Sequence, residues 1–333
     1  MKLKFNKGAV ILKAITLNYG AVPELTAKKT QEMVDKLLPE KDDFNFSKYD
    51  MQEIAIQTII EDAMTIPFLS DYKVIVVKNS FIFTGDKTKT TVEHHIEALV
   101  DFIERFEGPN FVIFEVNNEK LDERKKIVKL IKKQHDVNKI EAMDEAALKQ
   151  WIKKSLNEQF KDIKQDALDE LIQLTGADYK LITSELEKLL LYIGDEPIIV
   201  LSHIKAIVSR SLEQNVFLLT DYITTNRKKE AVTLLHDLIH MKEEPIKLLA
   251  LISGQYRLFY QAKILNQKGF SEAQIAKTLK THPYRVKLAI RKTGRMDLGD
   301  ILSTMEKCTA ADYQLKSSYM DKVLILELFI LSI

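Results

Sequence analysis

The chain has 333 residues, of which 46% are hydrophobic and 29% charged, and its formal net charge is +1. At roughly 100–200 residues per domain this length predicts two or three domains, and the near-neutral charge excludes a protein that is basic throughout and binds nucleic acid by bulk charge. The single cysteine, Cys308, excludes a disulfide framework and a cysteine-rich zinc module, as is typical of the reducing cytoplasm. Apolar runs are shorter than the roughly 18 residues of a membrane span, and Lys13 interrupts the first one, so we expect neither a span nor a signal peptide.

The N-terminal part, residues 1–142, alternates between β-branched runs and amphipathic segments. We expect strands at 15–20, 73–77 and 111–116, and helices at 23–38, 50–64, 92–106 and 124–134. Continuous apolar strands separated by helices are typical of a parallel sheet with both faces covered. The pattern therefore predicts an α/β domain.

Strand patterns almost vanish after residue 143. Helical periodicity predicts helices at 148–160, 165–175 and 179–192, a short helix from Ser202, and helices throughout residues 216–333. The expected layout is an α/β domain over 1–142, a small helical domain over 143–210 and a helical C-terminal domain over 211–333.

The turn after the first strand is where an ATPase of this layout would hold phosphate. Its sequence, Tyr19-Gly20-Ala21-Val22-Pro23-Glu24, has no second glycine and no Gly-Lys-Ser/Thr. Pro23 lacks an amide donor, and Glu24 would repel phosphate. The strand at 111–116 ends with Glu115 followed by Val116, so it lacks the acidic pair that would hold a metal ion. We therefore expect no ATP hydrolysis, catalytic residue, cofactor or metal.

Several short segments along nearly the whole chain form one recognisable set. They are Leu17-Asn18-Tyr19-Gly20 with Glu24-Leu25, Pro67-Phe68-Leu69-Ser70 before the strand at 73–77, Leu121-Asp122-Glu123-Arg124-Lys125-Lys126, Leu174-Thr175-Gly176-Ala177-Asp178, Glu243-Glu244-Pro245-Ile246-Lys247-Leu248-Leu249, Gln255-Tyr256-Arg257 and His282-Pro283-Tyr284-Arg285. Together these segments resemble one known family, the delta subunits of bacterial DNA polymerase III clamp loaders.

This resemblance implies a RecA-like, AAA+ type domain without a P-loop over 1–142, a three-helix lid over 143–210 and an oligomerising collar over 211–333. It implies a non-catalytic subunit that binds and opens the sliding clamp (beta) for loading onto primed DNA during replication. The implied partners are the delta prime and tau/gamma subunits in a hetero-pentameric ring, with primer-template DNA inside the assembly and no membrane. The nucleotidyltransferase activity of a DNA-directed DNA polymerase would belong to the cytoplasmic assembly as a whole.

The same resemblance points to Ile66, Pro67, Phe68 and Leu69 as the clamp-binding tip. Some family members carry Leu-Phe here, whereas this chain has Pro67-Phe68. Burying the Phe68 ring in a partner's pocket would stabilise a complex by about 1.5–3 kcal/mol. The alternative is that Phe68 packs inward beneath its own sheet.

A second candidate surface lies in the segment 271–295, which resembles a helix-turn-helix and begins with a capping box of Ser271 and Gln274. From 277 to 295 it contains seven basic residues and no acidic one: Lys277, Lys280, Arg285, Lys287, Arg291, Lys292 and Arg295. Sequence-specific DNA binding, non-specific contact with DNA or acidic neighbours, and a packed helix pair with a solvated basic side all remain open. An atypical AAA+ ATPase is the other alternative function.

Overall fold

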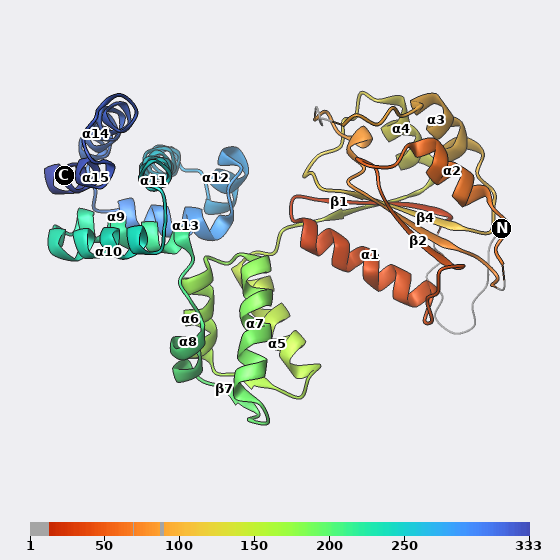
Figure 1. Ribbon diagram of the computed structural model, residues 1–333, viewed down its shortest axis with the longest axis horizontal. Coiled ribbons are helices and arrows are strands. Elements are labelled where there is room, and N and C mark those ends of the chain that lie inside the picture. The colour runs from red at the N-terminus through yellow and green to blue at the C-terminus, as the bar shows by residue number, and fades with distance from the viewer. Residues whose placement is uncertain (1–12, 69, 87–89) are drawn as a thin grey trace. The chain divides into compact units, whose positions relative to one another are not determined.

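The computed structural model describes residues 13–68, 70–86 and 90–333, and the chain divides into two compact units, residues 1–142 and 143–333 (Figure 1). The first unit is built on a five-stranded sheet with the order β2-β3-β4-β1-β5, in which every neighbouring pair is parallel. Its strands are β1 (Ile15–Gly20), β2 (Phe46–Asp50), β3 (Val74–Lys78), β4 (Phe111–Val116) and β5 (Asp136–Ile140). Its helices are α1 (Pro23–Leu37), α2 (Ile56–Met64), α3 (Ile96–Arg105) and α4 (Lys126–Gln134), with a 3-10 turn η1 (Phe81–Phe83).

Helices cover both faces of this sheet. On one face α1 packs its Met33, Val34 and Leu37 against Val76 and Ile113. On the other face α2, α3 and α4 form a larger core with the alternate strand residues, as Figure 1 shows for their positions around the sheet. Burial on both faces explains why the central strands are continuously apolar.

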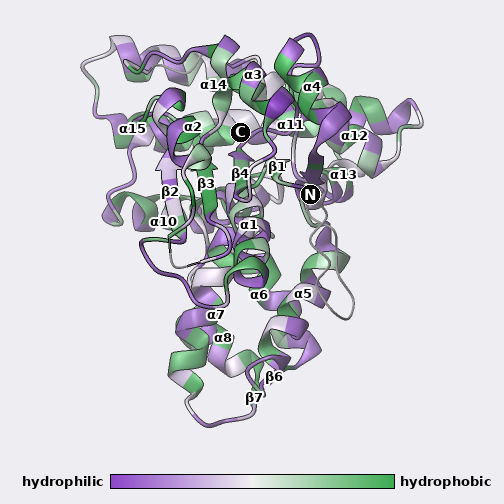
Figure 2. Cartoon of the chain, turned by 90° about the vertical axis from the view of Figure 1, so that its right-hand side faces the viewer, coloured by the Kyte–Doolittle hydropathy of each residue, from purple (hydrophilic) through white to green (hydrophobic). Residues whose placement is uncertain are grey.

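The two edge strands were not predicted, and residues 50–55 were wrongly assigned to a helix. β2 ends at Asp50, and α2 begins only at Ile56 after a turn in which the Asp50 carboxylate accepts a hydrogen bond from the Gln52 amide at 2.9 Å. Both β2 and β5 are edge strands and carry polar residues, which hide the strand pattern. In Figure 2, which is coloured by hydropathy, β3 has the colour of hydrophobic residues, whereas β2 is paler.

The second unit is almost entirely helical. Its first helices are α5 (Glu145–Asn157), α6 (Gln165–Thr175), α7 (Tyr179–Ile193) and α8 (Leu201–Ile207), joined at one end by the two short parallel strands β6 (Asp162–Ile163) and β7 (Ile198–Ile199), which were not predicted. The remaining helices are α9 (Leu212–Thr224), α10 (Lys228–His240), α11 (Pro245–Gln267), α12 (Glu272–Leu279), α13 (Pro283–Thr293), α14 (Leu298–Ser317) and α15 (Lys322–Ser332). The expected class, α/β followed by all-α, is confirmed.

Two hydrophobic cores stabilise this unit, one among α5–α8 and one among α9–α15. Helix α13 takes part in both, because Tyr284 and Leu288 pack into the first core while Val286 and Ala289 are buried in the second. None of the helices in the described part of the chain combines the length and apolar character that a membrane crossing requires.

Candidate functional site

The loop between α2 and β3 exposes apolar side chains. Ile66 is 90% exposed and Phe68 is 62% exposed, whereas Pro67 is half-buried. The alternative in which Phe68 packs beneath the sheet is therefore wrong. Leu69, the fourth predicted tip residue, lies outside the described residues. Exposed apolar side chains grouped on one loop are typical of a protein interface.

A buried asparagine holds both ends of this loop. The Asn110 side-chain amide donates hydrogen bonds to the carbonyl oxygens of Ala63 at 2.9 Å and Thr65 at 2.8 Å. The Asn110 side-chain oxygen accepts a hydrogen bond from the Lys73 amide at 2.9 Å. Because the side chain is buried and bonded through both its polar atoms, it fixes where the loop leaves α2 and where it enters β3.

A polar cluster beside Asn110 reinforces the base of the loop. The Lys73 ammonium forms an ion pair with Asp62 in the last turn of α2, at 2.6 Å, and both side chains are largely shielded from water. The Tyr49 hydroxyl of β2 donates to the other oxygen of Asp62 at 3.1 Å. Burial raises the pKa of the Tyr49 phenol, so it stays protonated and remains a donor. The loop thus rests on a cross-linked base.

One further aromatic residue lies against the tip, and the sequence analysis missed it. The ring of Phe44, in the loop between α1 and β2, lies 5.7 Å from the ring of Phe68, and the two planes are inclined at 57°. Phe44 is 57% exposed. Its position after two aspartates and before an asparagine, in Lys41-Asp42-Asp43-Phe44-Asn45, is typical of a surface turn and could have pointed to an exposed ring.

The connection from β1 to α1 has no room to wrap a phosphate group. Only Ala21 and Val22 lie between the end of the strand and the first helical residue, Pro23. A Cβ atom on Gly20 would lie 2.5 Å from the carbonyl oxygen of Ile140, so this glycine serves the close packing of β1 against β5. Glu24 stands in the first turn of α1, where a phosphate would require positive charge.

The carboxyl ends of the strands, where α/β proteins usually bind ligands, carry polar groups bonded to one another. The Asn138 amide donates to the Asn18 side-chain oxygen at 2.9 Å, and the Asn18 amide donates to the Thr30 hydroxyl at 3.0 Å. The buried Glu115 is the register neighbour of Asn18 and is hydrogen-bonded by Thr30. Burial raises the pKa of the Glu115 carboxyl, although the Thr30 bond and two nearby lysines oppose the shift.

The seven basic residues predicted as a DNA or partner contact divide into two groups. Three are engaged in ion pairs within the second unit: Arg285 with Glu213 at 3.4 Å, Lys287 with Glu145 at 2.6 Å, and Lys292 with Asp221. The other four are exposed and form no ion pair with any described residue: Lys277, Lys280, Arg291 and Arg295.

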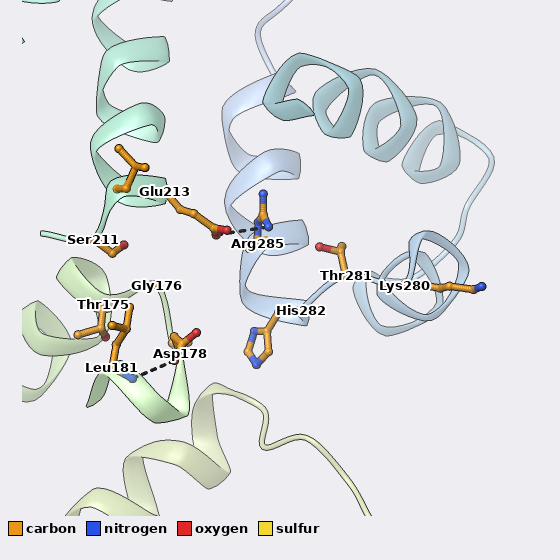
Figure 3. A pocket seen from close by; sticks show the side chains of 12 residues that line it. Thr175, Gly176, Asp178, Leu181, Ser211, Glu213, Lys280, Thr281, His282 and Arg285 are labelled. Atoms are coloured by element: carbon orange, nitrogen blue, oxygen red, sulfur yellow. Dashed lines mark hydrogen bonds and ion pairs between the residues drawn. The ribbon is translucent and has the colours of Figure 1, made fainter. Parts of the chain in front are cut away.

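Helix α13, the second helix of the segment that resembles a helix-turn-helix, is built into its surroundings. Besides the two cores that it joins, His282 forms a hydrogen bond with the Met143 carbonyl oxygen at 3.0 Å. A cavity of about 500 Å³ lies beside it, and Figure 3 shows Arg285 reaching across to Glu213 there. The charged residues that line the cavity balance, since Lys280 and Arg285 stand against Asp178 and Glu213. This packing argues against a base-reading helix that enters a major groove.

Helix α10 carries two histidines four residues apart, His236 and His240. His236 lies 2.8 Å from Glu327 of α15. Within residues 13–68, 70–86 and 90–333, no group of three or more histidine, cysteine or acidic side chains is arranged to hold a metal ion.

The fold and the exposed loop define a binding protein built on a parallel α/β sheet and continued by a helical unit. A family model described as "DNA polymerase III, delta subunit" matches residues 17–141, and one described as "DNA polymerase III delta subunit, C-terminal domain" matches residues 213–333. The chain belongs to the family of DNA polymerase III delta subunits, which confirms the resemblance found in the sequence.

Individual relatives agree with this assignment. The chain is 34% identical to DNA polymerase III subunit delta of Bacillus subtilis over 310 residues, which are 93% of this chain and 88% of that protein. It is 26% identical to a probable DNA polymerase III subunit delta of Aquifex aeolicus over 56% of this chain and 53% of that protein. The solved structure of the Bacillus subtilis DNA clamp loader delta protein superposes with a TM-score of 0.70 at 33% identity, covering 96% of this chain and 95% of that one.

Proposed function

We propose that this chain is the delta subunit of a bacterial clamp loader and that it binds the sliding clamp through the tip formed by residues 66–69. The observation that carries the proposal is the exposed Phe68 ring on a loop whose base is locked by Asn110. An aromatic anchor on a rigid support binds a pocket with little loss of conformational entropy.

Clamp opening requires that this chain bind two conformations of the clamp with different affinity. It requires no chemical reaction in this chain. The tip binds the distorted, opening conformation of the clamp more tightly than the closed ring, and this difference shifts the clamp towards opening. ATP is bound by sister subunits and controls access to the tip. Polymerisation belongs to other subunits of the cytoplasmic holoenzyme, so this chain is an accessory subunit.

The second unit serves assembly in this proposal. Residues 143–210 form the lid and residues 211–333 the collar that joins delta prime and tau/gamma subunits in a hetero-pentameric ring. Helix α15 supports this, because Leu324, Leu328 and Leu331 recur on its exposed side while Ile325, Leu326 and Phe329 fill the core. A helix that is apolar all round is typically covered on every side, and here the outer side needs a partner.

The deciding experiment is binding of the purified full chain to a purified bacterial sliding clamp without nucleotide, measured by size-exclusion chromatography and surface plasmon resonance. The proposal predicts a stable complex that the Phe68→Ala substitution weakens about tenfold or more. Full clamp affinity in Phe68→Ala would refute the role of the tip, and tight ATP binding by the isolated chain would favour the ATPase alternative.

A further inference from the structure

Two aromatic rings from separate loops form one exposed apolar surface. Phe44 precedes β2 and Phe68 precedes β3, and these strands are neighbours at the edge of the sheet. Both rings are more than half exposed, and they contact each other in a tilted arrangement. Any partner that covers the Phe68 ring therefore meets the Phe44 ring as well.

The backbone around Phe44 is held by a compact turn. One carboxylate oxygen of Asp42 accepts hydrogen bonds from the amides of Phe44 at 2.9 Å and Asn45 at 2.8 Å. The Asn45 side chain in turn accepts from the Asp42 amide at 3.0 Å and donates to the Glu40 carbonyl oxygen at 3.3 Å. The turn thus presents the Phe44 ring to solvent in an ordered state, although burying the ring would have been favourable.

The two loops are also joined where they enter the sheet. The Val74 amide donates to the Asn45 carbonyl oxygen at 2.8 Å, and the Tyr72 hydroxyl donates to the Leu37 carbonyl oxygen at 2.5 Å. Tyr72 is further fixed by its edge-on contact with Phe111 at 5.1 Å. Since both loops share these contacts, Phe44 and Phe68 keep their spacing as one unit.

We propose that Phe44 is a second aromatic anchor of the clamp-binding tip and enters the apolar surface of the sliding clamp together with Phe68. This inference rests on the proposed function, and the clamp is the occupant because the Phe44 ring is continuous with the proposed interface. Two rings held at a fixed spacing select a pocket that accepts both. Phe44 is therefore a specificity-determining residue, which neither the sequence resemblance nor the short tip motif identified.

The test is a double-mutant cycle with the full chain and a purified sliding clamp, measured by isothermal titration calorimetry without nucleotide. We expect Phe44→Ala to weaken binding about tenfold, and the double variant with Phe68→Ala to lose less than the product of the two single losses, because the rings are in contact. Phe44→Leu, which keeps an apolar side chain, retains part of the affinity. Circular dichroism and thermal unfolding verify that the exposed ring is not needed for folding.

Phe160→Ala is the matched control, since Phe160 is 94% exposed and belongs to the other unit. It should bind the clamp like the unsubstituted chain. If Phe44→Ala binds normally while Phe68→Ala is weakened, the inference about Phe44 is wrong and the proposed function stands. If neither substitution affects a measurable complex, both the inference and the tip assignment are wrong. If the unsubstituted chain does not bind the clamp at all, the inference and the proposed function fail together.

Discussion

Asn110 shows how one side chain can set the geometry of a binding loop. Its hydrogen bonds go to the backbone of Ala63, Thr65 and Lys73, none of which belongs to the proposed interface, and so hold both ends of the loop that carries Phe68. A shorter side chain would leave two carbonyl oxygens and one amide without these partners. The residue is therefore expected to position the tip as well as stabilise the first unit.

Replacing Asn110 with alanine tests this role. Loss of the buried hydrogen bonds should lower the free energy of unfolding by about 1–3 kcal/mol, and clamp affinity should fall because the tip is no longer held. Urea denaturation and clamp titration measure the two effects. Asn266→Ala, which alters an exposed asparagine near the end of α11, serves as the control. Unchanged stability and affinity in Asn110→Ala would contradict the positioning role.

The buried Glu115 carboxyl gives a prediction for how the stability of the fold depends on pH. Because burial raises its pKa in the folded state, the folded chain holds the proton more tightly than the unfolded chain, whose carboxyl titrates near the ordinary value of 4.5. The stability that this group contributes is full below that value and is lost as the pH rises through the folded-state pKa. Glu115→Gln cannot lose a proton and should gain stability relative to the unsubstituted chain as the pH rises.

Urea midpoints at a series of pH values compare the two proteins. The expected difference in unfolding free energy grows from acidic pH towards neutrality and then levels off. A difference that does not change with pH would show that the carboxyl titrates alike in the folded and unfolded chains.

At the level of helices and strands, the elements with a clear repeat of apolar residues were predicted correctly. Helix α6 was expected at residues 165–175 and has those bounds, and β1 and β4 were also placed correctly. The edge strand β2 was missed because its Phe-Ser-Lys-Tyr-Asp pattern has few apolar residues, and its neighbour in the sheet lies 24 residues further along the chain, from Asp50 to Val74. Pairing of this kind is a tertiary effect that local periodicity does not contain.

The residues of the candidate sites also divide into those that the sequence indicates and those that only the folded structure reveals. Phe68 was found because a short motif points to it, and the basic residues of 277–295 were found because they cluster in the sequence. Phe44 was missed because its contact with Phe68 joins loops that are adjacent only in the folded sheet. The ion pairs that engage Arg285, Lys287 and Lys292 were hidden for the same reason, since their acidic partners lie 71–142 residues away in the sequence.

The outer stripe of α15 gives a prediction at this scale. A charge placed on it by Leu328→Glu should impair assembly with the delta prime and tau/gamma subunits, because a carboxylate would be buried in an apolar contact. Multi-angle light scattering of the reconstituted assembly measures the loss of the full complex. The control is Leu191→Glu on the exposed side of α7, and circular dichroism checks that both variants fold. An intact assembly with Leu328→Glu would place the subunit contact elsewhere.

For the whole molecule, near-neutral charge means that any contact with DNA must come from a local patch. The candidate patch is formed by the four exposed cations of the segment 277–295 that make no ion pair with a described residue, Lys277, Lys280, Arg291 and Arg295. If they contact phosphates of primer-template DNA, each alanine substitution should reduce the salt dependence of binding, the slope of log K against log salt, by about one unit. Lys287→Ala, whose ammonium is paired with Glu145, should leave the slope unchanged. Fluorescence anisotropy with the reconstituted assembly at several salt concentrations gives these slopes, and equal slopes in all variants would exclude the contact.

The two-residue link between β1 and α1 limits what substitutions could restore. A glycine-rich phosphate loop of the Gly-x-x-x-x-Gly-Lys-Ser/Thr type spans about eight residues, so exchanging side chains in this link supplies too little backbone to surround a triphosphate. Extra chain would have to be inserted, and β1 would have to separate from β5 at Gly20, where their backbones touch. A phosphate loop could therefore not be built here by single substitutions, and in the proposed assembly the energy for each loading cycle would have to come from other subunits.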